Sequence, residues 1–226
     1  MDSKKYWRQA ARVYDQGARE YDAWFEGNPL FAAELAVLKG IVTPLTSPCL
    51  EVGVGPGRFA RDLGVEFGVD PALAPLRLAA GRGIRVCRAV GEELPVRTGS
   101  LGTVFLLFTL CFIEKPPEVL AECRRVLAPG GHLVLGCIVA QSAWGREIAR
   151  KKEAGHPFYR HARLYDSGQV EQWLADLGLV VAERRSGLFR SPGEEPGPEE
   201  SRSGVAPGAG MAVLVAEKPS GSGSRR

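Results

Sequence analysis

The chain has 226 residues, of which 45% are hydrophobic, and this length and composition suit one sizeable domain. The net charge is only +3 and the basic residues form no long stripe, so nothing indicates nucleic acid or an anionic membrane as a partner. No stretch approaches about 18 consecutive apolar residues, and the five cysteines lack C-x-x-C spacing. We therefore expect a cytoplasmic protein with reduced thiols, no membrane span and no metal site.

Residues 1–45 predict a separate helical segment at the start of the chain. Aromatic and small residues recur at three- and four-residue spacing over 6–25, which places them on one face of a helix. Asn28 and Pro29 interrupt the pattern, and a second helix is expected over 30–40. For the first aromatic residues of this segment, simple packing on the core is the favoured interpretation.

The most informative stretch is LEVGVGPGRFARDLGVEFGVD, residues 50–70. It opens within an apolar run over 49–52, which is typical of a buried parallel strand. Glycines at 53, 55 and 57 then remove three side chains, so the backbone can turn tightly and lie against a ligand. A second apolar run, 65–69, ends in Asp70. A carboxylate about 20 residues beyond such a turn holds ribose hydroxyls in nucleotide-binding α/β folds.

The spacing of the glycines helps to identify the nucleotide. They read G-x-G-x-G, and Arg58 stands where the dinucleotide fingerprint has its third glycine. Glu51, two residues before the first glycine, carries a charge that must face a ligand or find a hydrogen bond. This pattern resembles motifs I and II of the class I S-adenosylmethionine-dependent methyltransferases. The resemblance implies that Glu51, Gly53, Gly55, Gly57, Asp70 and Pro71 bind this cofactor, with Glu51 beneath its amino-acid part and Asp70 on its ribose.

Two further segments resemble the same family. AVGEELPV, residues 89–96, has the family's small residue, acid and Leu-Pro after the third strand, which implies that Gly91 and Glu92 lie at the adenine edge. YDAWF, residues 21–25, resembles the lid that many small-molecule methyltransferases fold over the cofactor. An aromatic face near the sulfonium would be favourable, because a desolvated cation over a ring gains about 2 kcal/mol.

The fourth strand is expected over 104–108, and the residues at its carboxyl end, Phe108 and Leu110 among them, should border the cofactor. The turn before it, TGSLGT at 98–103, lacks the aromatic and acidic residues usual in the family, so no acid-dependent contact is expected there. An amphipathic helix from Pro116, a PGG turn and a strand over 132–138 then resemble the family's passage into strand five.

Residues 141–168 form, by resemblance, a cap that faces the transferable methyl. Its aromatic, Arg and His content could recognise a planar or anionic small molecule, but a capping helix with a solvated charged face explains it equally well. The candidate acceptor-binding residues are Trp24, Trp144, Arg146, Tyr159 and Arg163, and the candidate general bases are Tyr21 and His161.

The rest of the chain completes the sheet. Strands are expected over 179–182 and 211–216, with a long flexible loop over 190–209 between them and a disordered tail over 218–226. The expected fold is α/β, a Rossmann-like seven-stranded methyltransferase sheet whose last strand is antiparallel. Its expected parts are an N-terminal helical lid (1–45), a cofactor-binding core (46–140), the cap (141–168) and the C-terminal part of the sheet (169–217).

These features predict methyl transfer from S-adenosylmethionine to a small-molecule acceptor, by in-line displacement, in a monomer or homodimer. The chain resembles a small prokaryotic branch of the type 11 methyltransferases whose acceptor the resemblance does not supply. Two alternatives stay open: a non-catalytic S-adenosylmethionine-binding regulator and, less favoured because of the glycine spacing, an NAD-dependent oxidoreductase. A methyltransferase acting on nucleic-acid bases would be expected to show a basic face and an N/D-P-P-Y/F motif, where this chain has TLCF.

Overall fold

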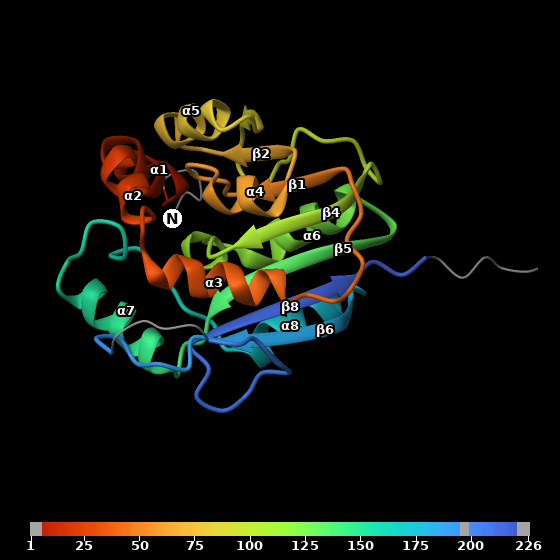
Figure 1. Cartoon of the computed structure of the whole chain (residues 1–226). Coiled ribbons are helices and arrows are strands. Elements are labelled where there is room, and N and C mark those ends of the chain that lie inside the picture. Colours follow the sequence, from red (N-terminus) through yellow and green to blue (C-terminus); the bar gives the residue numbers. More distant parts are fainter. Residues whose placement is uncertain (1–5, 195–198, 221–226) are drawn as a thin grey trace, which may run out of the picture.

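The computed structural model describes residues 6–194 and 199–220, and these form one eight-stranded sheet flanked by helices (Figure 1). The strand order is β3-β2-β1-β4-β5-β8-β6-β7. Strands β1 to β5 pair in parallel, whereas β8 runs antiparallel between β5 and β6. The strands are β1 Cys49–Val52, β2 Phe67–Asp70, β3 Arg85–Arg88, β4 Leu101–Leu107, β5 Leu127–Ile138, β6 Val180–Gly187, β7 Arg202–Ser203 and β8 Met211–Glu217.

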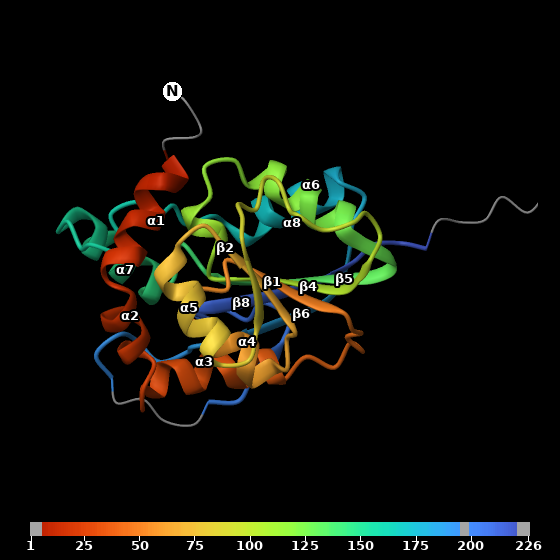
Figure 2. The same cartoon turned by 90° about the horizontal axis from the view of Figure 1, so that it is seen from above.

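Helices cover both faces of the sheet and so create two apolar cores. Figures 1 and 2 show α3, α4 and α5 on one face and α6 and α8 on the other. The apolar side chains of α6 and α8 pack against one face of the sheet, and Leu120 and Leu174 are fully buried there. The helices are α1 Tyr6–Gln16, α2 Ala18–Trp24, α3 Pro29–Lys39, α4 Arg58–Leu63, α5 Leu73–Gly81, α6 Pro116–Val126, α7 Ala143–Glu153 and α8 Ser167–Asp176.

The remaining helices, α1, α2 and α7, lie beyond the carboxyl ends of the parallel strands (Figure 1). In open α/β sheets this edge is where ligands bind, because loops diverge there and helix amino ends face the opening. The sequence-based fold class is confirmed, including the antiparallel last strand. Among the described residues, no helix has both the length and the apolar character needed to cross a membrane.

Several local expectations differ from the structure. Strand β5 begins at Leu127, before the expected 132, and β6 runs to Gly187, beyond the expected 182. The helix expected over 6–25 is broken at Gly17, where a side chain would collide with the Phe158 ring. Strand β4 begins at Leu101, because Gly102 lets the strand run against Thr46, and its N–H donates to the Pro48 carbonyl at 3.0 Å. The loop expected over 190–209 contains the short edge strand β7, which adds an eighth strand to the expected seven.

The expected disordered tail falls largely outside the described residues, which end at 220. Within the 190–209 loop the same holds for 195–198. The Glu199 carboxylate in the described part of this loop accepts hydrogen bonds from the backbone N–H groups of Phe189 and Arg190, at 2.7 and 3.0 Å. This tie fixes the loop next to the end of β6.

Candidate functional site

The glycine loop between β1 and α4 turns as the sequence predicts. Gly53, Gly55 and Gly57 have φ angles of +76°, +50° and +78°, which side-chain-bearing residues rarely adopt. A side chain at Gly53 would also collide with Thr109, and a Cβ at Gly57 would lie 2.9 Å from the Cβ of Ala79. The loop therefore needs glycine for backbone conformation and for close approach, and its open side faces a cavity.

Asp70, the last residue of β2, binds the glycine loop from the side. Its Oδ2 accepts a hydrogen bond from the Gly55 N–H at 3.0 Å, and its Oδ1 accepts one from the Ala72 N–H at 2.8 Å. Burial raises the pKa of Asp70 to about 6, although the two backbone hydrogen bonds act in the opposite direction. Each carboxylate oxygen keeps a further lone pair with which to accept a bond from a ligand hydroxyl.

Glu51 lies in the middle of β1 and is only 2% exposed. Its Oε2 atom is buried without a hydrogen-bond partner among the described residues. Burial and, secondly, the charge of Asp70 raise the pKa of Glu51 well above its usual range. A buried acceptor of this kind is costly unless a ligand satisfies it, so Glu51 fits a donor group, such as the amino group of an amino acid, bound over the loop.

The residues expected at the nucleoside side of the site line the same cavity. Pro71 follows Asp70, and Gly91 and Glu92 follow β3, so all three lie beyond the carboxyl ends of neighbouring strands. Burial raises the pKa of Glu92 above its ordinary value. The side expected to hold adenosine is therefore assembled from the loops that the sequence indicated.

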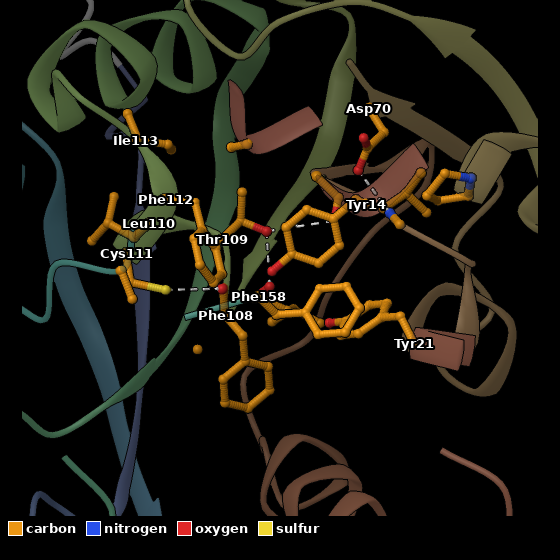
Figure 3. A pocket seen from close by; sticks show the side chains of 18 of the residues that line it. Tyr14, Tyr21, Asp70, Phe108, Thr109, Leu110, Cys111, Phe112, Ile113 and Phe158 are labelled. Carbon is orange, nitrogen blue, oxygen red and sulfur yellow. Dashed lines mark hydrogen bonds between the residues drawn. The ribbon is translucent and has the colours of Figure 1, made fainter. Parts of the chain in front are cut away.

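The residues that follow the carboxyl end of β4 form the opposite wall of the cavity. Phe108 has a φ of +52°, a strained conformation for a large side chain, and its N–H donates to the Gly136 carbonyl at 2.8 Å. Its ring packs 5.4 Å from that of Phe59. Leu110 and Cys111 follow it along the cavity, as Figure 3 shows. Burial raises the pKa of the Cys111 thiol far above its ordinary value, so this residue suits an apolar wall better than a nucleophile.

An aromatic roof closes the cavity, and it joins two parts of the chain that the sequence could not connect. Tyr14 of α1, Tyr21 of α2 and Phe158 of the cap lie with ring centroids 5.1 to 5.3 Å apart (Figure 3). Tyr21 reaches over the glycine loop, since a Cβ at Gly55 would lie 4.0 Å from its ring. The segments expected to form the lid and the cap thus meet above the loop.

Arg58, which replaces the third fingerprint glycine, ties the lid to this site. Its guanidinium donates to both carboxylate oxygens of Asp22, at 2.7 and 3.0 Å, and to Glu26 at 3.0 Å. Arg82 donates to the same Asp22 carboxylate at 2.8 and 2.9 Å, and to the Pro56 carbonyl at 2.8 Å. Two guanidinium groups therefore clamp α2 against the start of α4 and the end of α5.

Most of the residues expected near the acceptor line the cavity, but three do not. Trp24, Trp144 and Tyr159 are among the lining residues, as is Tyr21. The cavity lining does not include His161, Arg146 or Arg163. The guanidinium of Arg146 instead donates to the Gln141 carbonyl at 2.7 Å. The backbone N–H of Arg163 donates to the Cys111 carbonyl at 2.7 Å. The structure thus offers no support for these three assignments, because their positions lie outside the cavity wall.

Glu34 is a lining residue that the sequence interpretation missed. It lies on α3, is 6% exposed and faces the cavity one turn after Leu30. Burial raises the pKa of Glu34 to about 8. Its polarity among the apolar residues of this helix, LFAAELAVL, is the signal that could have identified it.

One cavity of about 390 Å³ connects all of these features, from Glu92 through the glycine loop to Tyr159. That volume lies within the usual range of about 300 to 1,000 Å³ for small-molecule sites. Its floor is backbone and carboxylate, and its roof is aromatic. This combination suits a ligand with a polar amino-acid and ribose part and a cationic centre.

Comparison with known proteins agrees with this geometry. A family model described as a methyltransferase domain matches residues 50–135, the segment from β1 to β5. A structure from Thermotoga maritima, described as a SAM-dependent methyltransferase and possible histamine N-methyltransferase, covers 92% of this chain and 99% of its own, with 28% identity and a TM-score of 0.85. The chain belongs to the class I S-adenosylmethionine-dependent methyltransferases, and S-adenosylmethionine is its cofactor.

Two curated relatives extend the comparison. An uncharacterised protein of Mycobacterium tuberculosis is 40% identical over 211 residues, which cover 92% of this chain and 74% of that protein. The malonyl-[acyl-carrier protein] O-methyltransferase of Alcanivorax borkumensis is 33% identical over 164 residues, which cover 63% of this chain and 51% of that enzyme. The first relative matches 92% of this chain, whereas the second matches a smaller part of it.

Proposed function

We propose that this chain transfers the methyl group of S-adenosylmethionine to a small-molecule acceptor bound under the aromatic roof. The observation that carries the proposal is the single cavity that holds the glycine loop and both acids at one end and aromatic side chains of the lid and cap at the other. Such a cavity can enclose a cofactor and a small acceptor together and keep water away from them. Within residues 1–45, α1 and α2 would then act as a lid, whereas α3 packs on the sheet, and residues 141–168 would act as a cap.

Each end of the cavity has its own part in this proposal. The bound cofactor would supply a methyl that its sulfonium already makes electrophilic. Glu51 and the glycine loop would hold its amino-acid part, Asp70 its ribose hydroxyls, and Gly91 with Glu92 its adenine. Phe108 and Tyr21 would orient the reacting centre from either side. Catalysis would then rest on alignment more than on acid or base chemistry.

The acceptor-side tyrosines fit binding better than proton removal. Burial raises the pKa of Tyr159 to about 12 and that of Tyr21 well above its ordinary value, so both phenols stay protonated at neutral pH. We therefore propose Tyr21 and Tyr159, with Trp24 and Trp144, as acceptor-binding residues. The Thermotoga relative, described as a possible histamine N-methyltransferase, makes a small amine a suitable first acceptor to test.

The cellular setting is part of the same proposal. The five cysteines are free, and the described lining carries no basic patch of the kind that nucleic acids require. We propose a cytoplasmic enzyme, monomeric or homodimeric, that acts on metabolites.

The proposal is tested in two steps with purified protein. Calorimetry should show that S-adenosylhomocysteine binds, and that Asp70→Ala weakens this binding by about tenfold or more, as expected for lost hydrogen bonds to a charged group. Incubation of a metabolite extract with methyl-labelled S-adenosylmethionine should then label a small molecule. Glu118→Gln, a change on an exposed face of α6, is the matched control for both steps. Binding without any labelled product would instead favour a cofactor-binding regulator, and absence of binding would overturn the proposal.

A further inference from the structure

Glu34 is a buried carboxyl group without a partner at the acceptor end of the cavity. It is 6% exposed, and within the described part of the chain no hydrogen bond or ion pair reaches it. Burial is the cause of its raised pKa, and no neighbouring cation offsets that effect. A carboxyl group in this position is costly to the fold, so a role towards a ligand is the simplest reason for its presence.

The position of Glu34 is on the acceptor side. Leu30 and Glu34 are one helical turn apart on α3, and both line the cavity. Burial, and after it the charge of Glu34, raises the pKa of Tyr159, and the same charge contributes to the raised pKa of Tyr21. Glu34 therefore lies near one phenol of the lid and one of the cap, and the residues proposed for the cofactor, Glu51 and Asp70, are a separate pair.

The charge of the cavity restricts what can bind there. In the described lining, the Arg and Lys side chains are already engaged, Arg58 by Asp22 and Glu26, and Lys151 by Glu147 at 3.8 Å, and His156 is a further lining residue. Among the described lining residues, an anionic acceptor would meet several carboxyl groups and no unpaired Arg or Lys, which disfavours the anionic class that the sequence left open. The described lining contains seven carboxyl groups: Glu20, Glu34, Glu51, Asp70, Glu92, Glu114 and Glu147.

The aromatic side chains that line the same cavity as Glu34 complement a cation on an apolar body. Trp24, Phe25 and Tyr21 form edge-to-face pairs at 5.0 and 5.2 Å, and Phe158 packs on Tyr21 at 5.3 Å. All four line the cavity. Ring faces attract a desolvated ammonium group, and they also pack against an aromatic or aliphatic substituent.

We propose that Glu34 binds the amino group of the acceptor, which is a primary or secondary amine carried on an apolar or aromatic body. This assignment rests on the proposed methyl transfer and specifies its substrate class. An amine bound to Glu34 gives the orphan carboxyl group its missing ion pair, and the aromatic side chains enclose the rest of the molecule.

Glu34 then also has a chemical task. An ammonium group has no lone pair, so it must lose a proton before it can be methylated. That proton passes to a carboxylate oxygen of Glu34, the freed nitrogen lone pair forms the new N–C bond, and the S–C electron pair remains on sulfur, which leaves S-adenosylhomocysteine and an N-methylated ammonium. A carboxyl group with a pKa of about 8 is matched to this exchange at neutral pH.

The test compares amines with the alcohols of the same shape. Protein saturated with S-adenosylhomocysteine is titrated calorimetrically with alkyl, benzyl, phenethyl and imidazolylethyl amines, and with the alcohol that corresponds to each. We expect at least one amine to bind about 10- to 100-fold more tightly than its alcohol, because a hydrogen bond to a charged group is at stake. Glu34→Gln should remove this preference, with unchanged affinity for S-adenosylhomocysteine, whereas Glu118→Gln should keep both.

Proton release supplies a second readout that does not depend on turnover. Titration of the preferred amine in buffers of different ionisation enthalpy should show release of a proton at pH 7 in the wild type, because Glu34 ionises when the ammonium group binds. Tyr21 and Tyr159, whose pKa values are raised by burial and also by the charge of Glu34, stay neutral in this range. His156, Glu147 and Lys151 are further titratable residues of the lining. Glu34→Gln should show no release.

The possible outcomes separate the two proposals. If S-adenosylhomocysteine fails to bind wild-type protein, the proposed function falls and this inference falls with it. If S-adenosylhomocysteine binds but every amine binds no better than its alcohol, or Glu34→Gln keeps the preference, only the assignment of Glu34 is overturned. Unchanged affinity of Glu34→Gln for S-adenosylhomocysteine shows that the variant is folded.

Discussion

Two buried carboxyl groups of this site, Asp70 and Glu34, have raised pKa values for the same physical reason and with different consequences. Asp70 keeps two backbone N–H donors, which partly offset its burial, and its pKa is about 6. Glu34 has no such donors, and its pKa is about 8. At neutral pH Asp70 is therefore mostly ionised and ready to accept from hydroxyl groups, whereas Glu34 is mostly protonated until a cation arrives.

The pKa of Asp70 predicts how cofactor affinity changes with pH. A protonated carboxyl group loses acceptor capacity, so affinity for S-adenosylhomocysteine should fall as the pH drops below about 6, by up to about tenfold per pH unit. Calorimetric titrations between pH 5 and pH 7.5 would measure this. Asp70→Asn should bind more weakly and lose the transition near pH 6, whereas Glu51→Gln should retain it. A transition that persists in Asp70→Asn would assign it to another group.

The raised pKa of Glu34 predicts that its replacement by glutamine stabilises the fold, whereas most substitutions in a protein core destabilise it. The pKa rises from 4.5 in the unfolded chain to about 8 in the folded protein, so ionisation destabilises the fold progressively above pH 4.5 and fully above pH 8. Glu34→Gln cannot ionise, and without ligands it should be more stable than wild type at pH 8.5, by up to about 5 kcal/mol. Near pH 4.5 the two should be alike. Denaturant unfolding at both pH values would measure this, and equal stability at pH 8.5 would contradict it.

At the scale of elements, the lid is held by ion pairs at one end and by rings at the other. Asp22 of α2 binds two guanidinium groups, while Tyr14 and Tyr21 pack on Phe158. Burial alone would raise the pKa of Asp22, but the hydrogen bonds from Arg58 and Arg82 bring it below its usual value. The lid is thus tied to α4 and α5 by charge and to the cap by apolar contact.

Loss of the charged tie should loosen the lid without disturbing the sheet. Asp22→Asn leaves Arg58 and Arg82 short of a carboxylate, and because these groups are partly exposed we expect about 1 to 2 kcal/mol of lost stability. Hydrogen exchange should become faster in α1 and α2 and stay unchanged in β4 and β5. Glu118→Gln, which removes an exposed pair with Lys115, is the control. Uniformly faster exchange would show instead that Asp22 supports the whole fold.

At the scale of the whole molecule, the cavity lies where the sheet, the lid and the cap meet. Ligand binding should therefore couple segments that contact each other through the cavity, in addition to stabilising the sheet. S-adenosylhomocysteine at about 100 times its dissociation constant should add about 2.7 kcal/mol to the free energy of unfolding. Hydrogen exchange should slow in the glycine loop and in α2. Protection limited to the loop would show that the lid does not close over the ligand.

The sequence alone determined the loop and the two acids that we propose for the cofactor. The glycine spacing, Glu51 and Asp70 lie within 20 residues of one another, so strand, turn and helix place them together whatever the rest of the chain does. The same local logic predicted the alternation of strands and helices and the antiparallel last strand. It misjudged the start of β4, because the contact of Gly102 with Thr46 is not local.

The part of the cavity that we propose for the acceptor was decided only by tertiary structure. Residues 21 to 26 meet Arg58 and Arg82, Gly17 meets Phe158, and Glu34 shares a cavity with Tyr159, and each of these pairs is far apart in the chain. These contacts depend on how the helices are placed over the edge of the sheet, and the hydrophobic periodicity of the sequence does not contain that information. The physical reason for the difference is that backbone geometry fixes neighbours within a turn, whereas burial, and with it the charge state of a group such as Glu34, is a property of the assembled molecule.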